Sequence, residues 1–187
     1  MRPPWKKLAP ALLLGGVLLS ASSVSAAAVP VAVPAALPAV TDVRTAIVDA
    51  ANGEIGQGET PPGSNCNPYG PCEAWCAHFA TWTWRQAGIN IPNYGFTGDI
   101  YTWGQGKGRA HSTNTGMQPG DIVLYGTGPQ NTNTSVHTGV VVAIGNGKIT
   151  TVEGNASNAV RKFGPFDPTH AKAAGRPGNI YGWVAAQ

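Results

Sequence analysis

The sequence predicts an α+β domain in which helices come first and an antiparallel sheet follows. In the first half of the chain, aromatic residues recur at helical spacing, as in Trp75, Phe79 and Trp82. In the second half the pattern changes to short apolar runs separated by turns rich in Gly, Pro and Asn, which is typical of strands. The pair Asn146-Gly147 between two such runs indicates a hairpin, and hairpin-linked strands run antiparallel.

A secretory signal peptide is predicted for residues 1–26. Three basic residues begin it, an apolar run follows at 8–19, and a small-residue cleavage site ends at Ala26. The apolar run is shorter than the ~20 residues that a membrane-spanning helix needs, so an uncleaved anchor is the less favoured alternative.

Residues 27–40 form an uncharged segment rich in Ala, Pro and Val. Proline recurs at Pro30, Pro34 and Pro38, which prevents a regular helix and favours an extended linker. Residues 41–187 then remain for a single domain with a sizeable core.

The charge balance offers no case for a highly charged partner. The whole chain has 12 Lys and Arg against 9 Asp and Glu, a formal charge of +3. Because the predicted signal peptide removes three basic residues, the mature chain is formally neutral. We therefore expect no nucleic-acid partner and no stable membrane association.

The helices are expected in three places. The first runs from Asp42 to about Ala51 with Thr41 as its N-cap, and a short third one covers 98–103. Between them a helix opens at Glu73 and ends near Gly88, a favourable C-cap. The expected buried stripe of this second helix consists of Trp75, Phe79, Trp82 and Gln86.

The strands are expected after a turn at 118–121. They share apolar or β-branched composition and boundaries marked by turn residues. Their predicted ranges are 122–125, 137–144, 148–153, 159–163 and 180–184.

Three cysteines, Cys66, Cys72 and Cys76, leave one thiol unpaired or intermolecular in an exported protein. A Cys66–Cys72 disulfide would close a tight loop over turn-forming residues and leave Cys76 free, which is the pairing we expect. A Cys72–Cys76 pair is conceivable at its helical spacing. A zinc site using the cysteines and His78 does not match the usual ligand spacing.

Cys76 is the candidate nucleophile. It falls in the first turn of the predicted second helix, at the margin of the buried face. The partial positive charge and unpaired N–H groups of a helix N-terminus favour a thiolate. The alternative is a structural buried thiol, because free cysteine is among the most buried residue types.

His137 is the best-placed candidate base. His78 shares the helix of Cys76 but points in another direction, and His111 and His170 lie in irregular polar stretches. His137 opens an apolar strand that can aim it at another element, although an ordinary strand-end histidine is the alternative reading.

The hairpin should return Glu153 and Asn155 to the side of His137, where either can accept a hydrogen bond from the imidazole. Glu153 is favoured, with Asn155 in support, because the strand is expected to end at Gly154.

Four motifs together resemble the CHAP domain, the cysteine, histidine-dependent amidohydrolase/peptidase family. They are Glu-Ala-Trp-Cys-Ala-His-Phe at 73–79, Pro-Gly-Asp-Ile-Val at 119–123, Val-His-Thr-Gly-Val-Val at 136–141 and Val-Glu-Gly-Asn at 152–155. The resemblance extends over about 41–184 and implies a papain-like fold, close to the NlpC-type cell-wall peptidases.

By this resemblance the cysteine is Cys76, the histidine is His137, and the third residue is Glu153 or Asn155. An oxyanion hole is expected to include the Cys76 backbone N–H and a side chain from the preceding loop, Tyr69 or Asn67.

The resemblance implies a secreted hydrolase that cuts amide bonds in peptidoglycan through a thioester, without metal or cofactor. We expect a monomer that is extracellular or associated with the cell wall, with peptidoglycan as its partner. Two rival functions share the fold: a non-catalytic wall-binding module, and a secreted effector hydrolase with another substrate.

Overall fold

The computed structural model describes residues 42–187; the predicted signal peptide (1–26) and linker (27–40) lie outside these residues. The described helices are α1 (Val43–Gly53), α2 (Cys76–Gln86) and α3 (Thr97–Gly106), with a short 3₁₀ helix, η1, at Pro168–His170. The strands are β1 (Ala110–His111), β2 (Ile122–Gly126), β3 (Ser135–Gly145), β4 (Lys148–Glu153), β5 (Arg161–Phe166) and β6 (Ile180–Val184). No helix within 42–187 is long and apolar enough to cross a membrane.

The strands form one antiparallel sheet in the order β1-β6-β2-β3-β4-β5. The β3–β4 hairpin turns at Asn146 and Gly147, whose φ values of 52° and 72° are those that a tight hairpin turn requires. This turn fixes the register that returns the end of β4 towards the start of β3. The predicted α+β arrangement of helices packed on an antiparallel sheet is confirmed.

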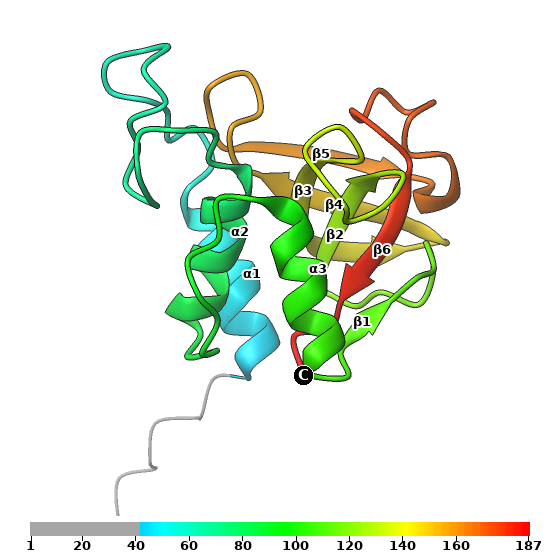
Figure 1. Cartoon of the computed structure of the whole chain (residues 1–187). Coiled ribbons are helices and arrows are strands. Elements are labelled where there is room, and N and C mark those ends of the chain that lie inside the picture. Colours follow the sequence, from blue (N-terminus) through cyan, green and yellow to red (C-terminus); the bar gives the residue numbers. More distant parts are fainter. Residues whose placement is uncertain (1–41) are drawn as a thin grey trace, which may run out of the picture. The chain divides into compact units, whose positions relative to one another are not determined.

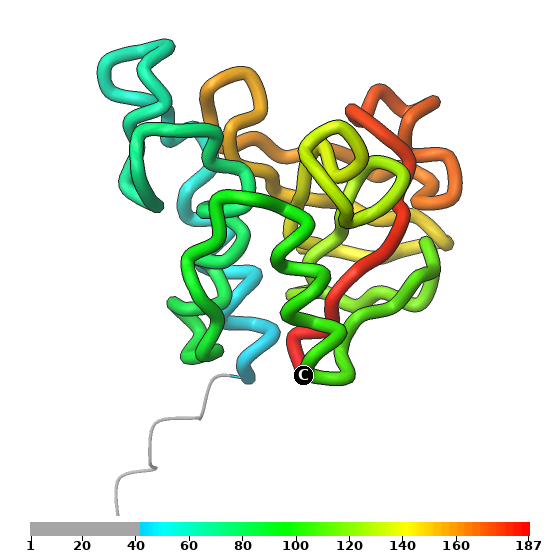
Figure 2. Tube along the Cα trace, in the orientation of Figure 1, coloured from blue at the N-terminus to red at the C-terminus, as the bar shows by residue number. Residues whose placement is uncertain are grey.

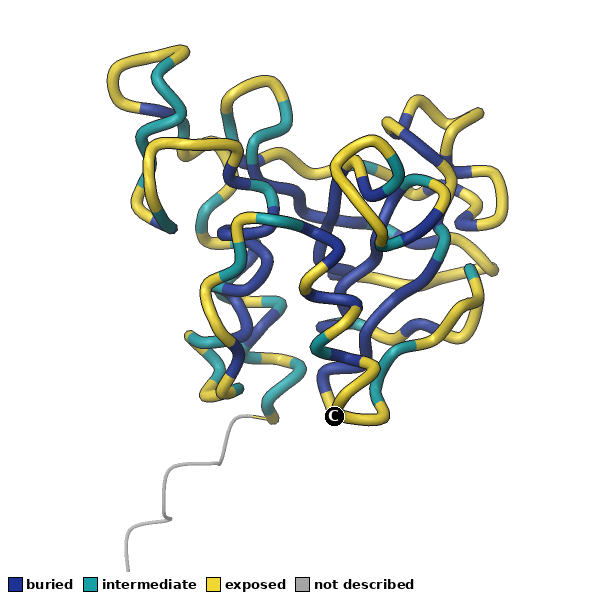
Figure 3. Tube along the Cα trace, viewed as in Figure 1, coloured by how far each residue is buried: buried dark blue, intermediate teal, exposed yellow. Residues whose placement is uncertain are grey.

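The helices cover one face of the sheet (Figure 1). Alternation along β2 divides its side chains between two cores: Ile122 and Leu124 pack towards the helices, while Val123 and Tyr125 belong to a second cluster. Figure 3 shows the strands as largely buried and the connecting loops as exposed. The central strands are therefore covered on both faces. The C-terminal end of the chain lies close to the last turn of α3 (Figure 2).

Helix α2 begins later than predicted. Glu73 and Ala74 precede it in a turn in which the Glu73 N–H donates to the Pro71 carbonyl oxygen at 2.8 Å. The turn follows the disulfide at Cys72, and the Glu73 side chain reaches forward to His78 instead of continuing a helix. Cys76 is consequently the first residue of α2.

The buried face of α2 is also wider than the predicted stripe. Gln86 is exposed, whereas Trp84 is fully buried and donates its indole N–H to the Gly120 carbonyl oxygen at 2.8 Å. The helix contacts α1, α3 and the sheet, so it buries more than one side. Two further differences are small: β5 begins and ends later than predicted, and the two-residue strand β1 was not predicted because two residues carry no periodicity.

Candidate active site

Cys76 opens α2 as a free, partly exposed cysteine. The loop before it is closed by a Cys66–Cys72 disulfide, so the predicted pairing is confirmed. The preceding residue, Trp75, is fully buried and donates its indole N–H to Glu59 Oε1 at 2.9 Å. This contact anchors the residue before the helix. The first backbone N–H groups of an α-helix lack intrahelical acceptors, and Cys76 is the first residue of α2.

His137 and Glu153 meet across the β3–β4 hairpin. His137 lies near the start of β3 and is paired in register with Tyr125 of β2. Glu153 is the last residue of β4, and its Oε2 lies 2.9 Å from His137 Nε2. Since Nε2 is occupied by Glu153, Nδ1 is the ring nitrogen that remains for Cys76.

Gly139 makes room for this carboxylate. A Cβ atom added at Gly139 would lie 2.7 Å from Glu153 Cγ, well inside contact distance. The glycine in the Val-His-Thr-Gly motif is therefore required by the position of the Glu153 side chain one strand away.

Glu153 is fully buried and both of its carboxylate oxygens are saturated with donors. Its Oε1 accepts from the Tyr125 hydroxyl at 2.9 Å and from the Thr151 hydroxyl at 2.7 Å. Its Oε2 accepts from His137 and from a guanidinium N–H of Arg176. A carboxylate with all lone-pair directions occupied has no room for a proton and cannot rotate away from the histidine.

The electrostatics favour an imidazolium–carboxylate pair. Burial lowers the pKa of His137, but interactions with Cys76 and Glu153 outweigh it and raise the pKa to about 9. Burial raises the pKa of Glu153, but His137, Arg176 and the Thr151 hydroxyl outweigh it and hold the pKa below its usual value. Burial and Glu153 raise the pKa of Tyr125 far above its ordinary range, so this hydroxyl remains a donor.

Asn155 does not share the position of Glu153. It lies beyond the end of β4 with a φ of 56°, so the strand alternation that would have placed it on the same face does not continue to it. It lines a cavity of about 370 Å³ together with His137 and Arg176. The structure thus brings Glu153 onto the imidazole and places Asn155 at the wall of the neighbouring cavity.

Tyr69 lies in the loop before α2, as expected, but its hydroxyl is engaged elsewhere. The ring is buried against Trp75, Phe79 and Trp82, and the hydroxyl donates to Glu54 Oε2 at 2.8 Å. This bond uses the only proton of the hydroxyl, so in this arrangement it has none to offer an oxyanion.

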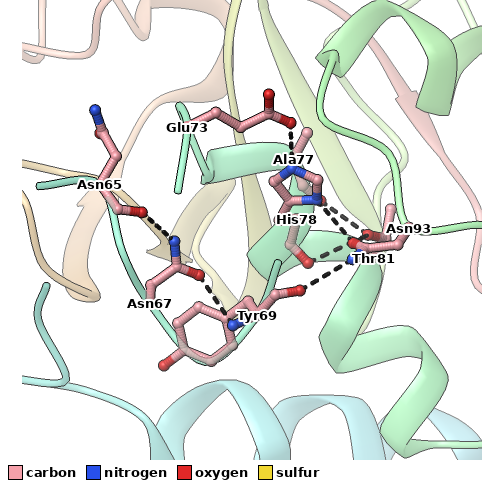
Figure 4. Close-up of polar contacts among 8 residues, drawn as sticks. All are labelled: Asn65, Asn67, Tyr69, Glu73, Ala77, His78, Thr81 and Asn93. Carbon is pink, nitrogen blue, oxygen red and sulfur yellow. Dashed lines mark hydrogen bonds and ion pairs between the residues drawn. The ribbon is translucent and has the colours of Figure 1, made fainter. Parts of the chain in front are cut away.

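The other loop candidate, Asn67, shapes the loop itself. Its amide donates to the Asn65 carbonyl oxygen at 2.7 Å, and its Oδ1 accepts from the Tyr69 N–H at 2.9 Å (Figure 4).

His78 forms a second histidine–carboxylate pair close to Cys76 in sequence (Figure 4). Its Nε2 lies 2.8 Å from Glu73 Oε1 and its Nδ1 lies 2.8 Å from Asn93 Oδ1. The Asn93 amide N–H in turn donates to the Tyr69 carbonyl oxygen at 3.1 Å. Both ring nitrogens of His78 are thus engaged within the scaffold, which ties the loop at 69–73 and the loop at Asn93 to α2.

The two remaining histidines lie apart from this arrangement. His111 is exposed and stacks on Trp183 with 3.9 Å between ring centroids, and His170 is exposed beside Asp167.

Three members of the Glu153 cluster were not anticipated: Tyr125, Thr151 and Arg176. Thr151 was within reach of sequence reasoning, because it lies two residues before Glu153 on the same strand face. Tyr125 required the β2–β3 register, and Arg176 lies in an irregular segment in which no pattern marks it.

Residues 67–155 match the family model of the CHAP domain. No curated protein matches the sequence. Among solved structures, NlpC2 from Trichomonas vaginalis is similar at 19% identity with a TM-score of 0.48, covering 81% of this chain and 48% of that one.

Two crystal structures of Ly7917, one of them with the hydrolyzing product of MDP, are similar at 15% identity. Their TM-scores are 0.47 and 0.48, and each similarity covers 78% of this chain and 62% of that chain. This chain therefore spans about half to three fifths of the length of these neighbours. The matched segment includes Cys72, α2, His137, Glu153 and Asn155, and it contains all four motifs that resemble the CHAP family.

Proposed function

We propose that this protein is a secreted cysteine amidase or endopeptidase that hydrolyses amide bonds in bacterial peptidoglycan. The observation that carries the proposal is His137, held on one nitrogen by the fully buried Glu153 carboxylate, with a pKa that interactions with the free Cys76 and with Glu153 raise. A nucleophile, a base and a group that orients the base are the parts that thiol acyl transfer requires. The match to the CHAP family model supports peptidoglycan as the proposed substrate class.

In the proposed reaction the Cys76 thiolate attacks the carbonyl carbon of the scissile amide. The His137 imidazolium protonates the leaving amine as the carbon–nitrogen bond breaks, which leaves an acyl thioester on Cys76. His137, now neutral, accepts a proton from water as water attacks the thioester, and the thiolate leaves. Glu153 keeps the ring oriented and stabilises the imidazolium in both steps.

The developing oxyanion is assigned to the backbone N–H groups at the start of α2. The Cys76 N–H has no intrahelical acceptor, and the dipole of α2 favours negative charge at this end. Tyr69 has no part in this assignment, because its hydroxyl proton is used by Glu54.

The proposal is tested by digesting purified peptidoglycan sacculi and analysing the released fragments by mass spectrometry. We expect fragments with a newly formed carboxylate and amine from the native protein, and none from Cys76→Ser, in which the thiolate is lost with little change in volume. The effect on turnover should reach ~10⁴-fold or more. Circular dichroism and thermal unfolding check that Cys76→Ser is folded.

Two results would contradict the proposal. Native-level digestion by folded Cys76→Ser would remove Cys76 as the nucleophile. Sedimentation of the native protein with sacculi, without any new fragments, would instead indicate a wall-binding module.

A further inference from the structure

Arg176 occupies an unusual place for an arginine. It lies in the irregular segment between η1 and β6, 23 residues beyond Glu153, and only 9% of it is exposed. Its backbone N–H donates to the Ala171 carbonyl oxygen at 3.1 Å, which fixes where the side chain leaves the chain. A buried guanidinium is costly unless it is paired, so the nature of its partner is informative.

The ionic partner of Arg176 among the described residues is Glu153. The guanidinium carbon lies 3.5 Å from the centre of the Phe163 ring and 5.9 Å from that of Tyr125, so aromatic faces hold its plane. Its Nε has no hydrogen-bond partner among residues 42–187. The cation is therefore committed to one carboxylate oxygen, Oε2, the same atom that accepts from His137.

We infer that Arg176 is a positioning residue for the proposed hydrolysis: it acts through Glu153, holding Oε2 on His137 Nε2 and keeping the carboxylate charged. The inference rests on the proposed function for its kinetic consequences, but its structural consequence can be measured without turnover. Arg176 lies outside the four sequence motifs, and in this role it acts through Glu153 without contacting the reacting atoms.

The reason that Arg176 is needed lies in the geometry of Glu153. The carboxylate stands at the end of β4, where the ladder to β3 no longer constrains it, and it is fully buried. Tyr125 and Thr151 hold only Oε1, so they leave rotation about that oxygen open. Arg176 supplies a second point of attachment at Oε2, and its positive charge opposes protonation of the fully buried Glu153.

The sequence offers a matched control in Arg161. It is paired in register with Glu153 on β5, but it is exposed and its Nε donates to the Ala156 carbonyl oxygen at 2.8 Å. Arg161 and Arg176 therefore carry the same charge near the same carboxylate, and only Arg176 touches it.

The experiment compares Arg176→Met, Arg176→Lys and Arg161→Met in the full chain, on one soluble muropeptide. We expect Arg176→Met to lower kcat by roughly 10- to 100-fold with KM unchanged, less than the ~10⁴-fold that loss of an orienting group can cost. The acidic limb of its pH profile should move to higher pH, because a carboxylate with one fewer cation binds a proton more readily. Arg176→Lys should restore the position of that limb, and Arg161→Met should match the native protein.

A double-mutant cycle separates positioning from packing. In a Glu153→Gln background, Arg176→Met should cause no further loss of kcat, because the group through which Arg176 acts is already gone. Additive losses, an unmoved acidic limb, or a rise in KM at constant kcat would each overturn the inference, the last by making Arg176 a substrate contact.

A readout without turnover keeps this inference distinct from the proposed function. In histidine-labelled protein, the hydrogen-bonded Nε2–H proton of His137 should be observed by NMR in the native chain and in Arg161→Met, and be broadened or lost in Arg176→Met. If the native protein hydrolyses no wall material but this signal follows Arg176, the proposed function fails and the positioning role stands. If Arg176→Met does not fold, Arg176→Gln, which keeps a donor but no charge, replaces it, and an unchanged signal and unchanged acidic limb in that variant overturn the inference.

Discussion

The molecule contains two buried histidines that each meet a glutamate, and they differ in what is left free. His78 on α2 and His137 on β3 are 3% and 9% exposed, and their distances to Glu73 and Glu153 are 2.8 Å and 2.9 Å. In His78 both ring nitrogens are engaged by the scaffold. In His137 one nitrogen is held by Glu153 and the other is available to Cys76.

The two glutamates differ as much as the histidines. The Glu73 side chain is 57% exposed and meets a single partner among residues 42–187. Glu153 is fully buried and accepts from four side chains of the same region. A histidine–carboxylate pair near a cysteine is therefore not diagnostic of a catalytic role. Burial of the carboxylate and a free second nitrogen are what distinguish the pair on the sheet from the pair on the helix.

The largest difference between the pairs is expected from neutralising each glutamate. Glu153→Gln should lower kcat/KM on a soluble muropeptide by ~10² to 10⁴-fold, because the amide neither stabilises the imidazolium nor fixes the tautomer. Glu73→Gln is the matched control and should stay within a few fold of the native protein. Equal losses in the two variants would show that the comparison does not identify the catalytic pair.

The pH profile of kcat/KM should report the protonation of His137, the histidine on the sheet, and not that of His78, the histidine on α2. Because His137 must carry a proton to donate to the leaving amine and its pKa is raised to about 9, kcat/KM should fall above about pH 9, by roughly tenfold per pH unit. The same raised pKa contributes stability that is fully present below the ordinary value of 6.5 and is lost as pH rises through about 9. Denaturant unfolding between pH 6.5 and about pH 9 measures this contribution of His137 to the free energy of unfolding. A basic limb of the kcat/KM profile near pH 6.5 would contradict the raised pKa of His137.

Asn155 tests whether the sheet histidine depends on a second residue. Asn155→Gly should lower kcat/KM by less than about tenfold, because Glu153 already saturates His137 Nε2. Asn155→Ala should have a similar effect on activity but be less stable than Asn155→Gly by ~1–2 kcal/mol, since alanine is strained at a φ of 56°. A loss from Asn155→Gly as large as that from Glu153→Gln would make Asn155 the orienting residue.

The smallest effect on activity is expected at the helix histidine. His78→Gln should leave kcat/KM within about twofold, since neither ring nitrogen of His78 is free to reach a reacting group. It should lower the free energy of unfolding by ~1–2 kcal/mol through its lost hydrogen bonds. Thermal unfolding measures this loss, and a folded His78→Gln protein without activity would assign the helix pair a role in catalysis.

The local spacing of apolar residues predicted most of the helices and strands, because each type of element has its own period. The bounds of β4 and β6 were predicted to the residue, and α1, α3, β2 and β3 to within a few. The start of α2 was wrong because the disulfide loop and the Glu73–His78 bond, not local propensity, set that boundary. The prediction of Cys76, His137 and Glu153 as one group needed only the hairpin turn and the motif order.

The tertiary structure alone decided which partners each of these residues received. The sequence made Tyr69 a reasonable oxyanion donor. In the structure, however, its hydroxyl donates its hydrogen bond to Glu54, which lies 15 residues earlier in the chain. The sequence favoured Glu153 over Asn155 only because the strand was expected to end at Gly154. The four hydrogen-bond donors to Glu153 come from β2, β3, β4 and the segment of Arg176, and the sequence did not predict them as a group. The physical reason is that hydrogen bonds and ion pairs form between side chains brought together from distant positions, whereas the sequence records only the period of each element by itself.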